Sequence, residues 1–415
     1  MYIDQIRIKD FRTFKNGRVD FIHPDAEFKR LDIPKPRLAN VNLILGNNGL
    51  GKTTLLKAIA LAALGPAVAS SGIYAYRLVR RGPEHQRRRI KKGLDGASEA
   101  LIEATFTPHM QDEVGTNIKV ESKVKVSRRQ DLEEFKWVHP DEKRWHPIFS
   151  ADSEAFFFVG YGATRRVEKP EQANLSGRRA SAFARAQRIQ SLFEEAYSLI
   201  PLSIWLPTQN KGRFAQVVKL INSALGPQQY RFRGEMEGGE YVFDRNGLRV
   251  PFPAMSDGYR AFLGWLGDLL YHVCMTCPGG KKLTENHGIV MVDEIDLHLH
   301  PHWQMTALPT LAKSLPNIQF IVTSHSPLIV GSLEWMNIIV MRPAADQSAE
   351  PARIRHAVHG LDSDQVLITE FFGLESTRAD PKQRRLKELT LQAREGDAKA
   401  AQTLLEEMSR GAEAT

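Results

Sequence analysis

The residues best suited to chemistry form a glycine-rich stretch near the start of the chain, Gly46-Asn47-Asn48-Gly49-Leu50-Gly51-Lys52-Thr53-Thr54. Glycines at this spacing let backbone N–H groups turn toward bound phosphates. The lysine that follows reaches the β- and γ-phosphates, and the next hydroxyl ligates Mg²⁺. The stretch therefore predicts a binding loop for a nucleoside triphosphate. The expected nucleotide contacts are Gly46, Asn47, Asn48, Gly49, Gly51, Lys52, Thr53 and Thr54.

Two carboxylates and a histidine follow apolar runs in the second half of the chain. Asp293 follows the run 288–292 and can bind Mg²⁺ beside Thr53, directly or through water. Glu294 is the next residue, so strand alternation points it the other way, where it can polarise an attacking water. His325 ends the run 320–324; such a histidine is more often structural, but next to the carboxylates we favour a role on the γ-phosphate or the water. Lys52, Glu294 and His325 are thus the predicted catalytic groups.

A second anion-binding feature is Ser256-Asp257-Gly258, which opens an apolar helix. A helix start offers N–H groups, a hydroxyl and the positive end of the helix dipole to an anion. One chain already has a loop for its own phosphates. We therefore expect Ser256 and Gly258 to cap the γ-phosphate of a nucleotide held by another copy.

The elements around these motifs alternate between strand and helix. Residues 41–45 read as a buried strand before the glycine loop, and 55–62 read as a helix after it. Such alternation predicts an α/β fold with a mixed, largely parallel sheet. Ligands bind at the carboxyl ends of parallel strands. The glycine loop, Asp293-Glu294 and His325 all lie at such ends, so three distant stretches should converge on one site.

The remaining segments complete the predicted architecture. Residues 1–22 alternate as a strand pair, 100–137 read as an antiparallel meander, 171–225 look helical, and 229–250 look like short strands. The expected parts are an N-terminal lobe (1–170), a helical insertion (171–228), a C-terminal lobe (229–345) and a helical extension (346–415).

Arg12 lies in the link of the first strand pair. It is either a surface turn residue or a nucleotide contact, because the strand before the glycine loop should return beside this hairpin.

The charge balance permits a nucleic-acid partner without demanding one. The 415 residues include 56 basic and 48 acidic side chains, a formal charge of +8. Residues 77–92 hold eight of the bases and a single acid, Glu84. This segment is a solvated face, a DNA or RNA phosphate contact, or the docking site of an acidic protein.

Two cysteines, Cys274 and Cys277, are the only thiols. Their spacing fits half a metal site or a redox pair, but no second pair exists and they follow an apolar run, so core packing is favoured. Few thiols, no signal-peptide pattern and no membrane-spanning apolar stretch predict a cytoplasmic protein.

Four motifs together resemble those of ABC-type ATPases of the SMC/RecF/OLD branch. They are Gly46–Thr54 as Walker A, Ser256–Arg260 as the signature, Asp293-Glu294 as Walker B, and Ser324-His325 as the switch histidine. The run 293–301 is close to the Asp-Glu-x-x-Leu-His-Leu-His-Pro form of OLD-like bacterial ATPases. The resemblance covers residues 1–60 and 250–345 clearly.

The resemblance implies a P-loop ABC-type head that uses ATP and Mg²⁺, hydrolyses ATP slowly and dimerises head to tail around two nucleotides. Residues 297–300 would form the D-loop, where His300 replaces a common aspartate. No glutamine stands at the usual Q-loop place, and the loop from Tyr161 to Arg165 is the candidate substitute.

Two features that the sequence does not contain narrow the choice among these ATPases. The sequence has no sustained heptads of a long coiled coil, and the roughly 70 residues after 345 are too few for the Toprim nuclease domain of OLD proteins. The head therefore resembles stand-alone ATPases of bacterial anti-phage systems, such as Septu PtuA ATPases and retron-associated relatives, which pair with a separate HNH nuclease. Residues 368–374 and the charged helices after them are the candidate partner contact. A RecF-like DNA-repair ATPase and an ATP-dependent scaffold with incidental hydrolysis are the alternatives.

Overall fold

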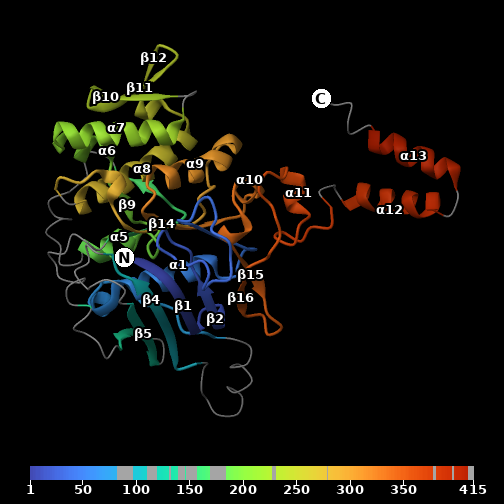
Figure 1. The fold of residues 1–415 in the computed structure, drawn as a ribbon, viewed down its shortest axis with the longest axis horizontal. Coiled ribbons are helices and arrows are strands. Elements are labelled where there is room, and N and C mark those ends of the chain that lie inside the picture. The colour runs from blue at the N-terminus through green and yellow to red at the C-terminus, as the bar shows by residue number, and fades with distance from the viewer. Residues whose placement is uncertain are drawn as a thin grey trace. The chain divides into compact units, whose positions relative to one another are not determined.

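The structure is a computed structural model that forms two compact units, Met1–Gly360 and Leu361–Thr415. All of the nucleotide-site motifs lie in the first unit, and Figure 1 shows the arrangement of its elements. The residues described are 1–81, 97–109, 119–129, 132–138, 145, 157–168, 184–226, 230–277, 279–376, 380–394 and 397–409.

A six-stranded sheet positions the site. Its order is β16 (Ala349–Ala352), β15 (Ile338–Pro343), β3 (Val41–Leu45), β14 (Ile318–Ser324), β13 (Gly288–Val292) and β7 (Phe158–Tyr161). Every neighbouring pair is parallel except β15–β16. The central strands β3, β13 and β14 are buried along their whole length, which is why they read as unbroken apolar runs. The predicted α/β fold with a mixed, largely parallel sheet is confirmed.

A five-stranded antiparallel sheet lies on the other side of helix α1 (Lys52–Leu64). Its order is β2 (Phe14–Asp20), β1 (Tyr2–Phe11), β4 (Glu99–Thr107), β5 (Val120–Arg129) and β6 (Leu132–Trp137). Helix α1 is apolar all round and shares one hydrophobic core with both sheets (Figure 1). Strand β3 belongs to a different sheet from the β1–β2 hairpin, but it lies beside the end of β2, where the Asn42 side chain donates to the Ile22 carbonyl at 2.8 Å and accepts from the Ile22 N–H at 2.9 Å. Only the turn of the hairpin approaches the glycine loop.

In the part of 171–225 that the structure describes, fewer residues are helical than the sequence predicts. It holds β8 (Arg166–Val167), α5 (Ala184–Gln190), β9 (Ser198–Leu199), α6 (Leu202–Trp205), η4 (Leu206–Thr208) and α7 (Lys211–Leu225). The predicted helix from Ala182 to Tyr197 stops at Gln190, because the chain turns to pair β9 with β8. Residues 169–183 lie outside the described residues.

A second helical layer covers the parallel sheet and carries a small meander. The meander is β10 (Arg231–Glu237), β11 (Glu240–Arg245) and β12 (Leu248–Pro251), as predicted for 229–250, and a short turn of helix, η5 (Phe252–Ala254), follows it. Next come α8 (Asp257–Thr276), η6 (Leu283–Glu285), α9 (Pro301–Ser314), α10 (Pro327–Gly331) and η7 (Trp335–Asn337). In Figure 1, α8 and α9 lie between the meander with α7 and the strands below them.

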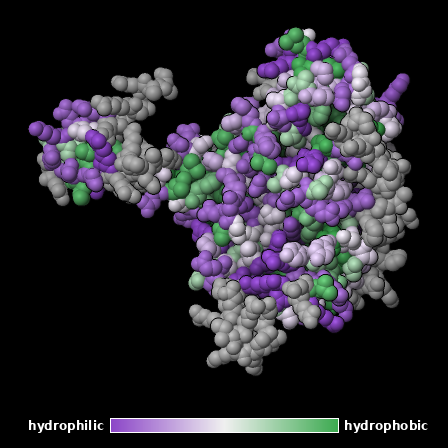
Figure 2. Space-filling view, turned by 180° about the vertical axis from the view of Figure 1, so that it is seen from behind, coloured by the Kyte–Doolittle hydropathy of each residue, from purple (hydrophilic) through white to green (hydrophobic). Residues whose placement is uncertain are grey.

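The second unit consists of α11 (Ser363–Leu367), α12 (Asp380–Arg394) and α13 (Ala398–Ser409). Asp362 caps α11 in a capping box with Gln365, so the predicted cap is confirmed. No helix within the described ranges combines the length and apolar character needed to cross a membrane. The face of the molecule in Figure 2 is mainly hydrophilic, with apolar residues in small groups.

Both cysteines are buried and free at the end of α8. Burial raises the pKa of the Cys274 thiol to about 12, and Arg213 donates to the Cys277 Sγ at 3.3 Å. Within the part of the chain that the structure describes, no group of three or more His, Cys, Asp or Glu side chains could hold a metal. The thiols therefore pack as small apolar side chains.

Candidate nucleotide-binding and hydrolysis site

The glycine loop between β3 and α1 has the backbone that its sequence requires. Gly49 and Gly51 adopt φ values of 81° and 85°, in the left-handed region that favours glycine. A Cβ at Gly51 would lie 2.3 Å from the Thr13 Oγ1, so the turn of the β1–β2 hairpin closes directly on the loop. Thr13 is a residue of the site that the sequence analysis did not single out.

Lys52 is folded over this loop. Its Nζ donates to the carbonyl oxygens of Gly46 at 2.7 Å and Asn47 at 3.3 Å, and the residue is only 7% exposed. Burial lowers the pKa of Lys52, and the charges of Asp293 and Glu294 oppose that shift. Phosphate oxygens accept stronger, charge-assisted hydrogen bonds than carbonyls do. The ammonium group is therefore held where a phosphate can take over its hydrogen bonds.

Asp293 joins the start of α1 to the ends of β13 and β14. The Thr53 Oγ1 donates to the Asp293 Oδ2 at 2.7 Å, and the Thr323 Oγ1 donates to the Asp293 Oδ1 at 2.6 Å. The two candidate Mg²⁺ ligands, Thr53 and Asp293, are thus in direct contact. Thr323 is fully buried and orients the carboxylate. The position of this threonine, directly after the apolar run 320–322 and two residues before His325, was the signal that could have identified it.

Glu294 does not continue the strand, which corrects the expected alternation. Strand β13 ends at Val292, and Glu294 has a φ of 47°. This left-handed conformation costs a non-glycine residue on the order of 1 kcal/mol or more. The Thr323 Oγ1 accepts from the Glu294 N–H at 2.7 Å, and Arg165 donates to its carbonyl at 2.8 Å. Two side chains from neighbouring elements therefore hold this carboxylate residue in a strained backbone.

Four side chains around these residues have a buried polar atom without a hydrogen-bond partner. They are Thr13 (Oγ1), Arg165 (Nη1), Asp296 (Oδ1) and His325 (Nε2). Buried polar atoms are normally paired, so their concentration in one place fits a site built for a polar ligand. Donors and acceptors of this kind, with Thr53 and Asp293, suit a triphosphate and its Mg²⁺.

His325 lies where the sequence predicts, directly after β14 and within electrostatic reach of the site. Burial and the charge of Lys52 lower the pKa of His325, while the charges of Asp296, Glu294 and Asp293 oppose that shift. The lowered pKa keeps the imidazole neutral at pH 7. A neutral ring can donate one hydrogen bond and accept another, as positioning a water molecule requires.

Arg12 lies in the two-residue turn of the β1–β2 hairpin, next to Thr13. Its backbone N–H donates to the Leu78 carbonyl at 2.7 Å. Burial lowers the pKa of Arg12, and the charge of Glu133 opposes that shift. A contact between Arg12 and the nucleotide stays a prediction, whereas its neighbour Thr13 touches the glycine loop directly.

The segment predicted as the signature begins α8 and contacts His298 of its own chain, within the predicted D-loop. Ser256 is the exposed N-cap of α8, and its side chain makes no capping hydrogen bond. A Cβ at Gly258 would lie 2.5 Å from the His298 carbonyl oxygen, so only glycine permits this approach. His300 caps α9, where its Nδ1 accepts from the His302 N–H at 3.4 Å. The roles of Ser256 and Gly258 on a second copy's nucleotide stay predictions.

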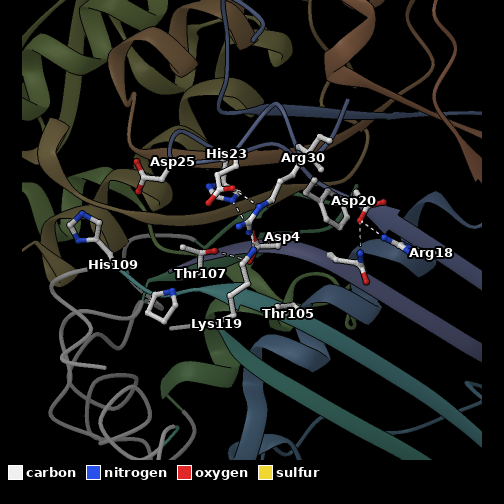
Figure 3. A pocket seen from close by; sticks show the side chains of 16 residues that line it. Asp4, Arg18, Asp20, His23, Asp25, Arg30, Thr105, Thr107, His109 and Lys119 are labelled. Carbon is white, nitrogen blue, oxygen red and sulfur yellow. Dashed lines mark hydrogen bonds and ion pairs between the residues drawn. The ribbon is translucent and has the colours of Figure 1, made fainter. Parts of the chain in front are cut away.

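A cavity of about 960 Å³ lies between the first residues of β1, the ends of β2 and β4, and the loop that follows β2 (Figure 3). Gln319, at the start of β14, donates to the Ile3 and Ile22 carbonyls beside it. In the cavity wall, Asp4 accepts hydrogen bonds from Lys119 at 2.8 Å and Thr107 at 2.7 Å. Because the Asp4 carboxylate is already paired, this cavity is a weaker candidate for the chemistry than the glycine-loop end.

Comparison with protein families gives one match, which begins after the glycine loop. Residues 64–331 match the family described as "AAA domain, putative AbiEii toxin, Type IV TA system". The chain belongs to this family.

Three relatives carry names that bear on function. Septu protein PtuA of Bacillus mycoides (strain KBAB4) is 25% identical over 379 residues, 91% of this chain and 46% of that protein. The Retron Ec83 probable ATPase of Escherichia coli is 34% identical over 119 residues, 29% of this chain and 22% of that protein. The Retron Vc95 probable ATPase of Vibrio cholerae serotype O1 biovar El Tor is 37% identical over 86 residues, 21% and 17% of the two chains. The predicted resemblance to Septu and retron ATPases is confirmed, although this chain spans less than half the length of each of these relatives.

Two solved structures of SMC heads match this chain with TM-scores below 0.5. An SMC head bound to the C-terminal winged-helix domain of ScpA has a TM-score of 0.49 at 15% identity, covering 85% of this chain and 98% of that one. The SMC head domain of Thermotoga maritima has a TM-score of 0.46 at 13% identity, covering 85% and 99%.

Proposed function

We propose that this chain is an ATPase that binds ATP with Mg²⁺ at the glycine loop and hydrolyses it slowly. The observation that carries the proposal is the contact between Thr53 and Asp293, which joins the loop to the carboxylate strand. Membership of an AAA domain family and the names of the retron relatives support it.

Each site residue then has a defined task. Thr53 and Asp293 would hold Mg²⁺, which neutralises charge on the phosphates, and Lys52 would bind the β- and γ-phosphates. Glu294 would accept the proton of the attacking water. The His325 Nε2, which has no partner, would donate to the γ-phosphate or hold that water.

Phosphate release by the purified protein tests the proposal. We expect Glu294→Gln to lower the hydrolysis rate about 10²–10⁴-fold, because a general base contributes that much, while ATP binding is retained. Glu237→Gln, an exposed glutamate in β10, is the matched control and should leave the rate unchanged. A wild-type protein without turnover, or a Glu294→Gln rate equal to wild type, would contradict the assignment.

We further propose that two copies close head to tail around ATP, with Ser256 and Gly258 acting across the interface. The exposure of Ser256 and its unused capping hydroxyl support this arrangement. Glu294→Gln with ATP and Mg²⁺ should sediment as a dimer. Adding Ser256→Arg should abolish the dimer while leaving ATP binding intact, and a dimer that persists with Ser256→Arg would exclude this interface.

The relatives' names favour a role in bacterial anti-phage defence, in which the ATPase regulates a separate effector, most simply an HNH nuclease. The candidate contact is the second unit, where Ile368 and Leu374 are 55% and 46% exposed. A neighbouring open reading frame for such a nuclease, whose product co-purifies with this chain, is the expected finding. Replacing Ile368 and Leu374 by serine should release the partner without changing ATP turnover.

A nucleic-acid partner is the second candidate, and a specific surface favours it. Tyr74 and Tyr76 are 73% and 51% exposed, and their rings stack at 6.0 Å with 14° between the planes. The Arg77 guanidinium lies 5.1 Å from the Tyr76 ring centre. Aromatic faces beside arginine suit unpaired bases, each stacked base adding about 1–3 kcal/mol. This surface extends the predicted 77–92 segment, most of which (82–92) lies outside the described residues.

Not every arginine of that segment is available for a nucleic acid. Arg80 is 4% exposed, and its Nη1 donates to the Thr13 carbonyl at 2.9 Å, so it fixes the hairpin turn. Single-stranded RNA or DNA should bind with a steep salt dependence. Tyr74→Ser with Tyr76→Ser should weaken binding at every salt concentration, whereas Arg77→Gln should flatten the salt slope. Salt-insensitive or absent binding would exclude this candidate.

A further inference from the structure

Arg165 is a partly buried cation of the site, and the proposed function gives it no role. It follows β7, the strand that pairs with β13, so its loop runs beside Asp293 and Glu294. One guanidinium nitrogen, Nη2, donates to the Glu294 carbonyl at 2.8 Å. The other, Nη1, is buried and has no hydrogen-bond partner.

The surroundings of Arg165 are acidic. Burial lowers the pKa of Arg165 to about 10, and the charges of Asp293, Asp296 and Glu294 oppose that shift. The side chain therefore stays charged at neutral pH. Its planar guanidinium carries parallel N–H donors that match the oxygens of a phosphate. A purely structural arginine in a buried site would be expected to use both nitrogens.

The same loop is fastened to helix α8. The Arg165 guanidinium lies 6.0 Å from the ring centre of Trp265, and a Cβ at Gly264 would lie 2.4 Å from the Val167 side chain. At the other end of the loop, the Tyr161 hydroxyl donates to the buried Asp268 Oδ2 at 2.8 Å.

The three partners of the loop on α8 lie at positions 264, 265 and 268, so they share one face of the helix. The N-cap of that helix is Ser256. The loop thus connects the carboxylate end of β13 to the helix that begins with the signature segment.

We propose that Arg165 binds the γ-phosphate of ATP and thereby couples the presence of that phosphate to helix α8. This inference rests on the proposed ATP binding and adds a discriminating residue to it. With ADP, Arg165 keeps only its contacts to the Glu294 carbonyl and to Trp265. With ATP, its free nitrogen gains a phosphate oxygen, and the loop that packs against α8 is held in one position.

Affinity for two nucleotides tests this directly. Dissociation constants for a non-hydrolysable ATP analogue and for ADP, each with Mg²⁺, are measured by isothermal titration. Arg165→Met should reduce the preference for the triphosphate at least about tenfold, since a charged hydrogen bond contributes about 1.5–3 kcal/mol. Arg166→Met is the matched control, because Arg166 is the exposed neighbour and its loss changes the net charge equally.

The outcomes separate this inference from the proposed function. If the wild-type chain binds neither nucleotide, the proposed function itself fails. If it binds both and Arg165→Met keeps the wild-type preference, Arg165 is no γ-phosphate ligand. Lys52→Ala should weaken the binding of both nucleotides, which shows that the titration reports this site.

A second variant and a second signal cover the case of misfolding. Arg165→Lys keeps the charge but not the paired donors, so it should fold and still lose several-fold of the triphosphate preference. Trp265, which is 2% exposed beside Arg165, reports the movement. Fluorescence of the wild type minus that of Trp265→Phe should change with the ATP analogue and not with ADP. An equal change with both nucleotides would overturn the coupling to α8.

Discussion

The two ends of the parallel strands carry polar clusters that differ in how they are satisfied. At the glycine-loop end, Thr13, Arg165, Asp296 and His325 each keep a buried polar atom without a partner. At the other end, around Asp4, the carboxylate accepts hydrogen bonds from Lys119, Thr107 and His23, and the buried atoms without a partner are ring nitrogens, the Nδ1 of His23 and the Nδ1 of His287, which stacks on His109.

This difference separates a site from a structural cluster. Paired charges stabilise the fold and have little left to offer a ligand. Unpaired buried atoms reduce stability by about 1–3 kcal/mol each, so they persist where a ligand will satisfy them. Both clusters contain carboxylates, cations and histidine, so residue types alone do not distinguish them. The hydrogen-bond partners do.

The sharpest test of this contrast is Lys52→Ala. We expect roughly 100-fold weaker ATP binding, because charge-assisted hydrogen bonds to phosphates contribute about 1.5–3 kcal/mol each. The free energy of unfolding should change little, since the Lys52 Nζ bonds only to loop carbonyls. Lys57→Ala, five residues further along the same helix, is the control. Equal binding by wild type and Lys52→Ala would place the nucleotide elsewhere.

A smaller effect is expected from Thr323→Val, which keeps the shape of the side chain. It removes the hydroxyl that donates to Asp293 and accepts from the Glu294 N–H. Unfolding in urea should show a loss of about 1–3 kcal/mol, and the Mg²⁺ concentration needed for half-maximal ATPase activity should rise. Thr306→Val, on the exposed face of α9, should change neither quantity. A normal Mg²⁺ requirement in Thr323→Val would show that Asp293 needs no such support.

The smallest effect should come from Asp4→Asn in the structural cluster. Burial raises the pKa of Asp4, but hydrogen bonds from His23, Lys119 and Thr107 outweigh it, so the pKa lies below the ordinary value of 3.8. A lowered pKa stabilises the fold above pH 4 and loses that contribution as the pH falls through the folded-state value. Asp4→Asn should therefore be about 1 kcal/mol less stable at pH 7, with a difference from wild type that shrinks below pH 4. ATP binding should stay normal. A loss of ATP binding would show that the Asp4 cluster contributes to the nucleotide site.

Motif spacing was enough to predict the parallel sheet and the convergence on one edge. Each motif there is a local signal attached to an apolar strand, and parallel strands bring their carboxyl ends together. The same reasoning failed at Glu294, the residue after Asp293, which was expected to continue the strand. The strand ends before Glu294, and the backbone there is left-handed. Local periodicity carries no information about where a strand stops.

Thr13 and Thr323 were not predicted because their roles depend on contacts with residues far away in the sequence. Thr13 reaches the glycine loop only because α1 is held between the two sheets, and Thr323 acts through Asp293 on the neighbouring strand. The position of Arg165 was indicated by its glycine-bearing loop, but its link to α8 depends on tertiary packing with Trp265.

The burial of α1 has a mechanical consequence. Its alanines Ala58, Ala60, Ala62 and Ala63 are inaccessible to solvent, and the helix contacts both sheets. A helix packed in this way cannot rotate when a nucleotide binds at its N-terminus. Any movement that the nucleotide drives would then occur in the part of the chain that begins at the exposed Ser256, and α1 would stay fixed.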